Sequence, residues 1–407
     1  MYFTFAWRYF KAKKSANAIN IIAWVTVGVI AFATACQLLV LSVFNGFEDL
    51  VKSLYSSFYA DIRVVPARGK TFFLTAAQID AIKKLPGIAA TSLSAEDKAL
   101  LQHDSQQSIT YLKGVDENYT AVTGLASYIH QGSFNTGTAD EPGLVIGAGI
   151  QNAAAIAVGY GMQPSVVSLT VPRRGKVSVN DPLQSLGEGV AQATGVFAIQ
   201  QDFDNKYSIT NIDFVKQQMG FAADEYSAVE IKLSKDITPD AAKSSLQQLL
   251  GSTCKVESKY EQNMTLYNTM RMEKWVIYAV LTLILVVAAF NMISALTMLV
   301  LEKQKDINVL QSMGAHQSAI LKIFLSEGLL LGIIGTALGI IMALITCFLQ
   351  VQFKLLKLQG GTFIIDYFPV KLVATDFVLV SATAILIAFL ASWFPAKKAA
   401  AQPFELR

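Results

Sequence analysis

The tripeptide Gly69-Lys70-Thr71 has the residue types with which a phosphate-binding loop ends, so it is a candidate for nucleotide chemistry. Such a loop needs a further glycine five residues before Gly69, because its backbone must curl around the phosphates. Val64 occupies that position, and the flanks do not resemble a buried strand leading into a helix. The sequence therefore predicts no nucleotide site, and any ATP-dependent work must be driven by another polypeptide.

Other residue types that commonly do chemistry are isolated in this 407-residue chain. His103 and His130 are far apart and have no Cys or Glu at metal-ligand spacing, which favours surface or structural histidines. Cys36 and Cys347 fall in apolar stretches and Cys254 stands alone, so no internal disulfide framework is predicted. We predict no catalytic residue, no metal and no directly bound cofactor. The net charge of +3 includes no basic run that would indicate nucleic-acid binding.

Four stretches without a charged residue dominate the chain. Each is near the roughly 20 residues with which a helix crosses a bilayer. Buried helices of a large soluble protein are disfavoured, because 53% of the residues are hydrophobic and only 15% are charged. We therefore predict a membrane α-helical fold with four transmembrane helices, at Ile21 to Phe44, Trp275 to Leu301, Gly328 to Val351 and Phe377 to Phe394.

Basic residues in the short flanks predict the orientation of these spans. The first apolar stretch exceeds a signal-peptide core and has no small-residue cleavage pattern, so it is interpreted as a retained anchor. The segment between spans three and four, which would lie outside if both termini are cytoplasmic, also carries basic residues, namely Lys354, Lys357 and Lys371. Both termini are nevertheless expected to be cytoplasmic, from Arg8, Lys11, Lys13 and Lys14, from Lys303, Lys305 and Lys322, and from Lys397, Lys398 and Arg407.

The long polar insert after the first span is predicted to be a large mixed α/β extracytoplasmic domain between helices 1 and 2. The predicted divisions are 1–46 for the tail and first span, 47–271 for the domain and 272–407 for the other spans. The first span is expected to continue as a helix through Glu48 to Tyr59. Further helices are predicted from Thr75 and over Pro239 to Leu250, and strands at Asp61 to Val65, Ser108 to Gly114, Leu144 to Ile146, Val166 to Val171, Gly195 to Ile199 and Ala228 to Leu233.

One connection in the insert is unusually long, and it runs over residues 173–194 between two predicted strands. Connections of this length are commonly functional or disordered. A projecting partner-binding loop and a merely mobile loop fit it equally well. Its candidate contact residues are Arg173, Arg174, Lys176, Asp181, Pro182 and Leu183.

The connection between spans two and three is predicted to contain a short amphipathic helix near residues 302–315. Ile307, Leu310 and Met313 share one helical face, and Gly314 supplies a stop. This helix could lie on the lipid surface, cap the bundle or insert into a groove of a cytoplasmic partner. Its mixed charge, with Glu302, Lys303 and Asp306, weakens the lipid-surface interpretation.

The sequence from Asn291 to Ser294, and from Asp306 to Ala315, resembles the second span and coupling helix of FtsX-like ABC permeases, especially the lipoprotein-releasing Lol type. Further pieces agree in order along nearly the whole chain, namely Ser42 to Phe47, Leu112 to Asp116, Phe324 with Glu327 and Gly328, and Phe394 to Ala399.

The resemblance implies a permease subunit in a Gram-negative inner membrane that works with a cytoplasmic ATPase dimer and a second permease, like or unlike. ATP and Mg would bind to the ATPase, onto which the coupling helix would dock. A lipoprotein would enter between the first and second spans from the membrane lipid and leave to a periplasmic carrier, which the loop at residues 173–194 would contact. The alternative is an FtsX-like or MacB-like permease that exports a toxin or peptide or regulates a cell-wall hydrolase. A more distant alternative is a sensor without an ATPase.

Several residues within the spans have both a structural and a functional interpretation. Asn291 could bond across a permease dimer or line the cavity, although packing between helices is favoured. Glu327 could sense protonation, but an interfacial position or a pair with Lys322 is favoured. Small residues are expected to allow close helix packing at Gly328, Gly332, Gly335 and Gly339.

Overall fold

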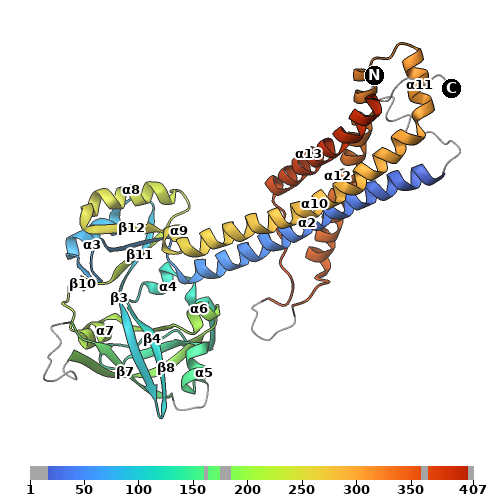
Figure 1. The fold of residues 1–407 in the computed structure, drawn as a ribbon. Coiled ribbons are helices and arrows are strands. Elements are labelled where there is room, and N and C mark those ends of the chain that lie inside the picture. Colours follow the sequence, from blue (N-terminus) through green and yellow to red (C-terminus); the bar gives the residue numbers. More distant parts are fainter. Residues whose placement is uncertain (1–16, 160–163, 175–184, 359–364, 402–407) are drawn as a thin grey trace. The chain divides into compact units, whose positions relative to one another are not determined.

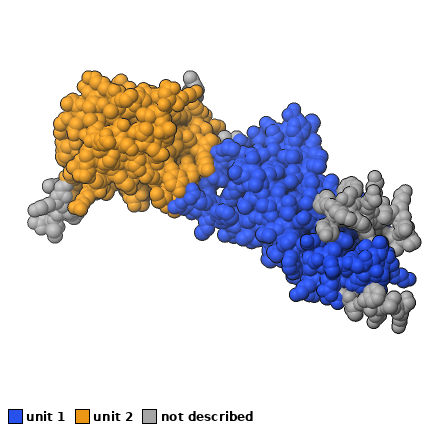
Figure 2. Space-filling model, turned by 90° about the horizontal axis from the view of Figure 1, so that it is seen from above, with its two compact units in different colours: residues 1–50, 268–407 blue, residues 51–267 orange. Residues whose placement is uncertain are grey.

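A computed structural model describes residues 17–159, 164–174, 185–358 and 365–401. The chain divides into two compact units, of which unit 1 comprises residues 1–50 and 268–407 and unit 2 comprises residues 51–267 (Figure 2). The described part contains four helices that are long and apolar enough to cross a membrane.

Unit 1 is built from long helices (Figure 1). Each predicted span lies inside one of them, and the expected extension of the first span is confirmed because its helix continues to Phe58. A short helix, α11, separates the second and third long helices. The helices are α2 (Asn17–Phe58), α10 (Met264–Glu302), α11 (Gln304–Ser312), α12 (Gln317–Phe353) and α13 (Ala374–Ala400).

Two glycines of α12 bring α13 close. A Cβ added at Gly328 would lie 2.0 Å from the Ser392 Oγ, and one added at Gly332 would lie 2.4 Å from the Ala388 Cβ. Both distances are shorter than atoms tolerate, so only glycine permits this packing. This pair of glycines therefore lies at a close contact between α12 and α13.

The next two glycines of α12 face α2 instead. A Cβ at Gly335 would lie 2.9 Å from the Ile30 side chain, and one at Gly339 would lie 2.6 Å from the Ala31 carbonyl oxygen. The third span therefore packs against the fourth through one glycine pair and against the first through another. Small residues let backbones approach closely where water cannot drive association.

Unit 2 contains a ten-stranded sheet in the order β12-β1-β11-β3-β4-β9-β6-β8-β5, with β7 paired to β3 and β8. Most pairs are antiparallel, whereas β4 with β9 and β6 with β8 are parallel. A separate two-stranded sheet joins β10 and β2. The strands are β1 (Ile62–Pro66), β2 (Phe72–Phe73), β3 (Ile88–His103), β4 (Gln106–Val115), β5 (Ile129–Gly132), β6 (Gly143–Gly147), β7 (Val166–Pro172), β8 (Leu186–Phe197), β9 (Tyr207–Asn211), β10 (Glu225–Tyr226), β11 (Ala228–Leu233) and β12 (Cys254–Ser258).

The helices of unit 2 are short, and four of them, α3, α7, α8 and α9, are capped by a side chain at their N-terminus. Thr75 caps α3 through a reciprocal capping box with Gln78, and Pro239 opens α8 one residue after its cap, Thr238. These helices are α3 (Ala76–Lys84), α4 (Tyr119–Val122), α5 (Ala148–Ala154), α6 (Gln201–Asp204), α7 (Ile212–Met219), α8 (Pro239–Leu250) and α9 (Lys259–Gln262), with 3-10 turns at Leu125–Tyr128 and Gly251–Thr253.

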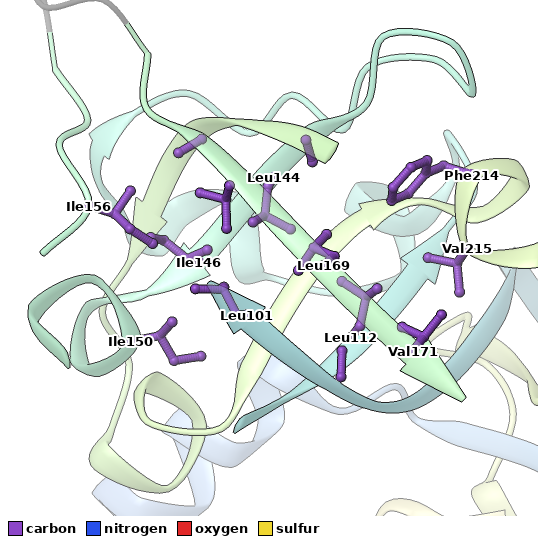
Figure 3. Close-up of a cluster of buried hydrophobic side chains, with 14 of the residues drawn as sticks. Leu101, Leu112, Leu144, Ile146, Ile150, Ile156, Leu169, Val171, Phe214 and Val215 are labelled. Carbon is purple, nitrogen blue, oxygen red and sulfur yellow. The ribbon is translucent and has the colours of Figure 1, made fainter. Parts of the chain in front are cut away.

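Two hydrophobic cores stabilise unit 2. One lies where α5 and α7 pack on the strands β3, β4, β6, β7 and β8, and it includes Leu112, Leu144, Ile146 and Phe214 (Figure 3). The other lies under α3 and α8, where Leu246 and its neighbours cover β1, β11 and β12. The mixed α/β character predicted for this part of the chain is thus present. The first core also holds β7 and β8, the two strands that the long connection joins.

The structure corrects two sequence-based predictions here. The strand expected at Gly195 begins at Leu186, so the connection after β7 is shorter than predicted. The long strand β3 was not predicted, and neither were the shorter strands β2, β5, β9, β10 and β12. The cause of the first error is visible in the packing: a Cβ at Gly187 would lie 2.0 Å from the Gln218 carbonyl oxygen, and one at Gly189 2.6 Å from the Phe214 ring. These glycines mark close approach of α7 to the strand rather than a loop.

Candidate functional site

The predicted coupling helix exists as α11, but it begins at Gln304 rather than at Glu302. Glu302 is the last residue of α10, and Lys303 lies between the two helices. Lys303 Nζ lies 3.3 Å from Asp306 Oδ2, which makes an ion pair across the first turn. Gly314 has a φ of 88°, a left-handed conformation that suits glycine and ends the segment.

The apolar residues of α11 divide between two sides. Ile307 is only 1% exposed, whereas Val309 and Met313 are 58% and 79% exposed. Leu310 is half-buried between these extremes. The predicted common face of Ile307, Leu310 and Met313 is therefore wrong, because Ile307 packs into the helical unit with Leu299, Val300, Ile320, Phe324, Ala396 and Ala399. Ile307 holds α11 in place, and the outward apolar pair is Val309 and Met313.

The long connection is held at its base by its two arginines. The Arg173 amide donates to the Ser185 carbonyl over 2.7 Å, and its Nε donates to the Gln218 carbonyl over 3.3 Å. Arg174 forms an ion pair with Glu225, a carboxylate that is 2% exposed. These arginines therefore support the connection. The other candidate contacts, Lys176, Asp181, Pro182 and Leu183, lie outside the described residues.

Asn291 lies on the outer surface of unit 1, where its side chain is exposed. The favoured prediction, that it packs helices together within the chain, is therefore wrong. Its neighbours along the same side of α10 are Val287 and Met298, at 58% and 52% exposed, and the polar Ser294. An amide on an outward face in the middle of a predicted span requires a polar partner, since hydrocarbon offers none.

Glu327 has the opposite environment. Its residue exposure is 3%, and its Oε2 has no hydrogen-bond partner among the described residues. The favoured prediction was an interfacial position or a pair with a neighbouring lysine such as Lys322, and the Oε2 atom accepts no hydrogen bond from a lysine among the described residues. Glu327 precedes Gly328, so it lies beside the tight contact between α12 and α13.

Sequence reasoning missed a polar cluster that joins three of the long helices. We name Asn45 of α2, Lys274 of α10 and Asp376 of α13 the polar ring. Lys274 Nζ donates to Asn45 Oδ1 and to Asp376 Oδ2, both over 2.9 Å, and Asn45 Nδ2 donates to Asp376 Oδ2 over 2.6 Å. Asn45 and Asp376 are 5% and 7% exposed. No sequence signal could find this set, since its members are hundreds of residues apart.

A second missed cluster lies within unit 2 beneath the end of α2. Lys113 Nζ lies 2.5 Å from Glu230 Oε1, and both side chains are nearly fully buried. Burial opposes the charged form of Lys113, but the Glu230 carboxylate outweighs it and raises the lysine pKa. Tyr119 lies beside this lysine, and burial of its hydroxyl raises the tyrosine pKa to about 12. The ring of Phe58 stacks 4.4 Å from that of Phe203, which fixes the end of α2 within unit 2.

The described residues hold no group of three or more His, Cys, Asp or Glu side chains arranged as metal ligands. His103 Nδ1 instead lies 3.0 Å from the Ala154 carbonyl oxygen.

Family models give the class of protein to which this architecture belongs. The model of the FtsX-like permease C-terminal region matches residues 278–404, and that of the MacB-like periplasmic core domain matches residues 23–249, more than half of the chain. This chain is an FtsX-like permease. The permease therefore pairs a membrane unit with an extracytoplasmic domain of the MacB-like type.

Curated relatives resemble the permease along nearly its full length. The lipoprotein-releasing system transmembrane protein LolE of Haemophilus influenzae is 26% identical over 98% of this chain and 96% of the relative. The corresponding LolC of Xylella fastidiosa is 26% identical with the same coverage. The pyoverdine export protein PvdT of Pseudomonas syringae is 24% identical over 83% of this chain but 50% of its own length. Of these three relatives, LolE and LolC match along nearly their whole length and PvdT along half of its length.

Proposed function

We propose that this permease is a non-catalytic subunit of an ATP-driven complex that releases lipoproteins from the inner membrane of a Gram-negative bacterium to a periplasmic carrier. The near full-length similarity to LolE and LolC supports this assignment. In this proposal both termini and α11 are cytoplasmic, and unit 2 is periplasmic. The membrane lipid delivers the lipoprotein between the first and second spans.

The observation that carries the proposal is the outward apolar pair on α11. Val309 and Met313 are exposed on the α11 segment, which Ile307 anchors in the helical unit. Two apolar side chains on a short, anchored helix are suited to insertion into a groove of another protein. We assign this surface to a cytoplasmic ATPase, which would bind ATP and Mg and supply the energy by hydrolysing the ATP.

Movement of α11 would then be passed to the spans through its anchor. Ile307 packs against residues of α10, α12 and α13, including Val300, Phe324 and Ala399. A push on Val309 and Met313 therefore acts on three spans together rather than on a free loop. Because α10 runs unbroken from Met264 to Glu302, a displacement at its inner end reaches its outer end.

A second permease subunit, like or unlike, is assigned to the face of α10 that carries Asn291. Val287, Asn291, Ser294 and Met298 follow one another at spacings of four, three and four residues, which places them on one stripe. An acyl chain cannot hydrogen-bond to the Asn291 amide, whereas a polar residue of another helix can. The stripe thus favours a protein partner over lipid.

The alternative function is a permease of the same family that exports a toxin or peptide or regulates a cell-wall hydrolase. The similarity to PvdT favours it in part, but that resemblance covers half of the relative's length. Purification of a tagged full-length chain in mild detergent, followed by mass spectrometry, separates the proposals. We expect a cytoplasmic ATPase, a second permease and a lipoprotein; recovery without any ATPase would contradict both, and a peptide exporter's cargo would favour the alternative.

A further inference from the structure

We propose that the polar ring of Asn45, Lys274 and Asp376 is a latch that keeps the first and second spans together until the complex is driven open. This inference deepens the proposed function, because it concerns the gap through which the cargo is proposed to enter. Figure 1 shows α2 and α10 side by side in unit 1, and the side-chain links between the two helices include the ring, the hydrogen bond of Gln37 and the Lys52 ammonium over the Tyr267 ring.

Two of these links, Asn45 with Lys274 and Gln37 with Thr282, follow one regular register. Lys274 meets Asn45, and the Gln37 amide donates to Thr282 Oγ1 over 3.2 Å. The two residues of α2 are eight positions apart, and so are their two partners on the antiparallel α10. Eight residues are slightly more than two helical turns, so both links lie on the same seam. The two helices therefore have a regular polar contact along the outer half of the two spans.

The ring is asymmetric in a way that suits opening. Lys274 and Asp376 form an ion pair between α10 and α13, whereas α2 contributes only the neutral amide of Asn45. If α2 moves away, the lysine and the carboxylate keep each other, and no charge is left unpaired in a poorly solvated place. Only the hydrogen bonds of Asn45 are lost. The ring is thus strongest between the helices that stay together and weakest at the gap.

The link at Gln37 has the same character. Gln37 is fully buried, its Nε2 bonds to Thr282, and its Oε1 has no partner among the described residues. By contrast, the hydroxyls of Tyr278 and Thr383 form a further bond between α10 and α13. In these two links α2 contributes neutral amides, whereas α10 and α13 share the ion pair of Lys274 with Asp376 and the hydroxyl bond of Tyr278 with Thr383.

A direct test measures the distance between α2 and α10 in the assembled complex in lipid. Val40 and Val276 are exposed, at 42% and 56%, and lie outside the ring. Nitroxide labels at V40C and V276C would be read by pulsed electron paramagnetic resonance without nucleotide, with Cys36, Cys254 and Cys347 replaced by alanine. The tested substitution is Asn45→Leu, which keeps the size of the side chain and removes both hydrogen bonds of the amide.

We expect the labelled parent to give one dominant distance, and Asn45→Leu to add a longer one whose population is larger by about tenfold or more, since two bonds to charged groups are lost. Lys274→Met should behave in the same way. Lys371→Ala is the matched control, because its ion pair with Asp49 also reaches α2 but has both side chains about half exposed. Its distance should match that of the parent.

The latch is overturned if Asn45→Leu and Lys274→Met keep the parent distance while the chain still assembles with its partners. It is overturned equally if Lys371→Ala opens the gap to the same extent. A purely structural role would lower the melting temperature without a new distance. Because the measurement needs neither lipoprotein nor carrier, failure of lipoprotein release would contradict the proposed function and leave this result standing.

Discussion

Ile307 and Val309 are two residues apart on α11, yet Ile307 is 1% exposed and Val309 is 58% exposed. This difference divides the helix into a side that anchors it in unit 1 and a side that is open to a partner. Met313, at 79% exposed, extends the open side by one turn. The division gives each side of the helix a separate experimental consequence.

Charges on the open side should abolish ATPase binding. The double variant Val309→Asp with Met313→Asp would place two carboxylates in an apolar groove, which costs about 3 kcal/mol or more, a loss of more than a hundredfold in affinity. Co-purification of the ATPase measures it. Gln304→Asp is the control, since it adds a charge to an exposed residue on another side of α11. Equal ATPase recovery from all three chains would contradict the assigned surface.

A methyl group at Gly332 should loosen the membrane unit. Gly332→Ala sets a Cβ 2.4 Å from that of Ala388, and such overpacking costs about 1–3 kcal/mol. Gly28→Ala is a matched change in another span, with no atom within 4 Å of the new Cβ, and it should be neutral or slightly stabilising. Thermal unfolding in detergent compares them. Equal melting temperatures would show that α12 and α13 do not meet at this glycine.

Removing the outward amide of α10 should weaken the permease pair. In the proposed subunit contact, Asn291→Leu would delete a hydrogen bond worth about 1 kcal/mol, so association should fall roughly fivefold. Energy transfer between labelled chains in vesicles measures this. Val378→Leu, at a residue of α13 that is 70% exposed, is the control. Unchanged transfer for Asn291→Leu would place this amide outside the subunit contact.

Asp204 should make unit 2 less stable as the pH rises. Burial raises the pKa of this carboxyl to about 6 from an ordinary 3.8, although hydrogen bonds from backbone amides partly oppose the shift. A raised folded-state pKa favours folding below pH 4, and this contribution is lost as the pH rises through 6. Asp204→Asn should therefore stabilise unit 2 by about 1 kcal/mol at pH 7.5, after allowance for solvent screening.

Hydrogen exchange of β9 in the full chain measures the effect of Asp204→Asn. The variant and parent should exchange at equal rates at pH 4, after correction for the intrinsic pH dependence, and the variant more slowly at pH 7.5. Equal corrected rates at both values would mean that the carboxyl is not desolvated in the folded state.

Local signals allowed part of the fold to be predicted from sequence. The helix α8 begins at Pro239 and ends at Leu250 as expected, because proline suits a first turn and Gly251 follows the last one. The long apolar stretches likewise lie in helices of spanning length. Strand β3, Ile88–His103, escaped because it is rich in Ala, Ser and charged residues, and its strand structure depends on pairing with β4 and β11.

The candidate site could be predicted only where its members are neighbours in sequence. The coupling helix follows from one short segment, but the burial of Ile307 depends on Phe324 and Ala399 from two other helices. Asn45, Lys274 and Asp376 each border an apolar stretch and individually look like ordinary interfacial polar residues. Their hydrogen bonds form only when three spans pack together, so no local sequence pattern predicts these bonds.

The most direct test of the proposed function is lipoprotein release from vesicles that contain the complete complex and a tagged lipoprotein. With the carrier and ATP added, we predict that the lipoprotein moves to the soluble fraction, and that Val309→Asp with Met313→Asp abolishes this movement while Gln304→Asp preserves it. Release that continues without ATP, or that is unaffected by the double substitution, would contradict the account.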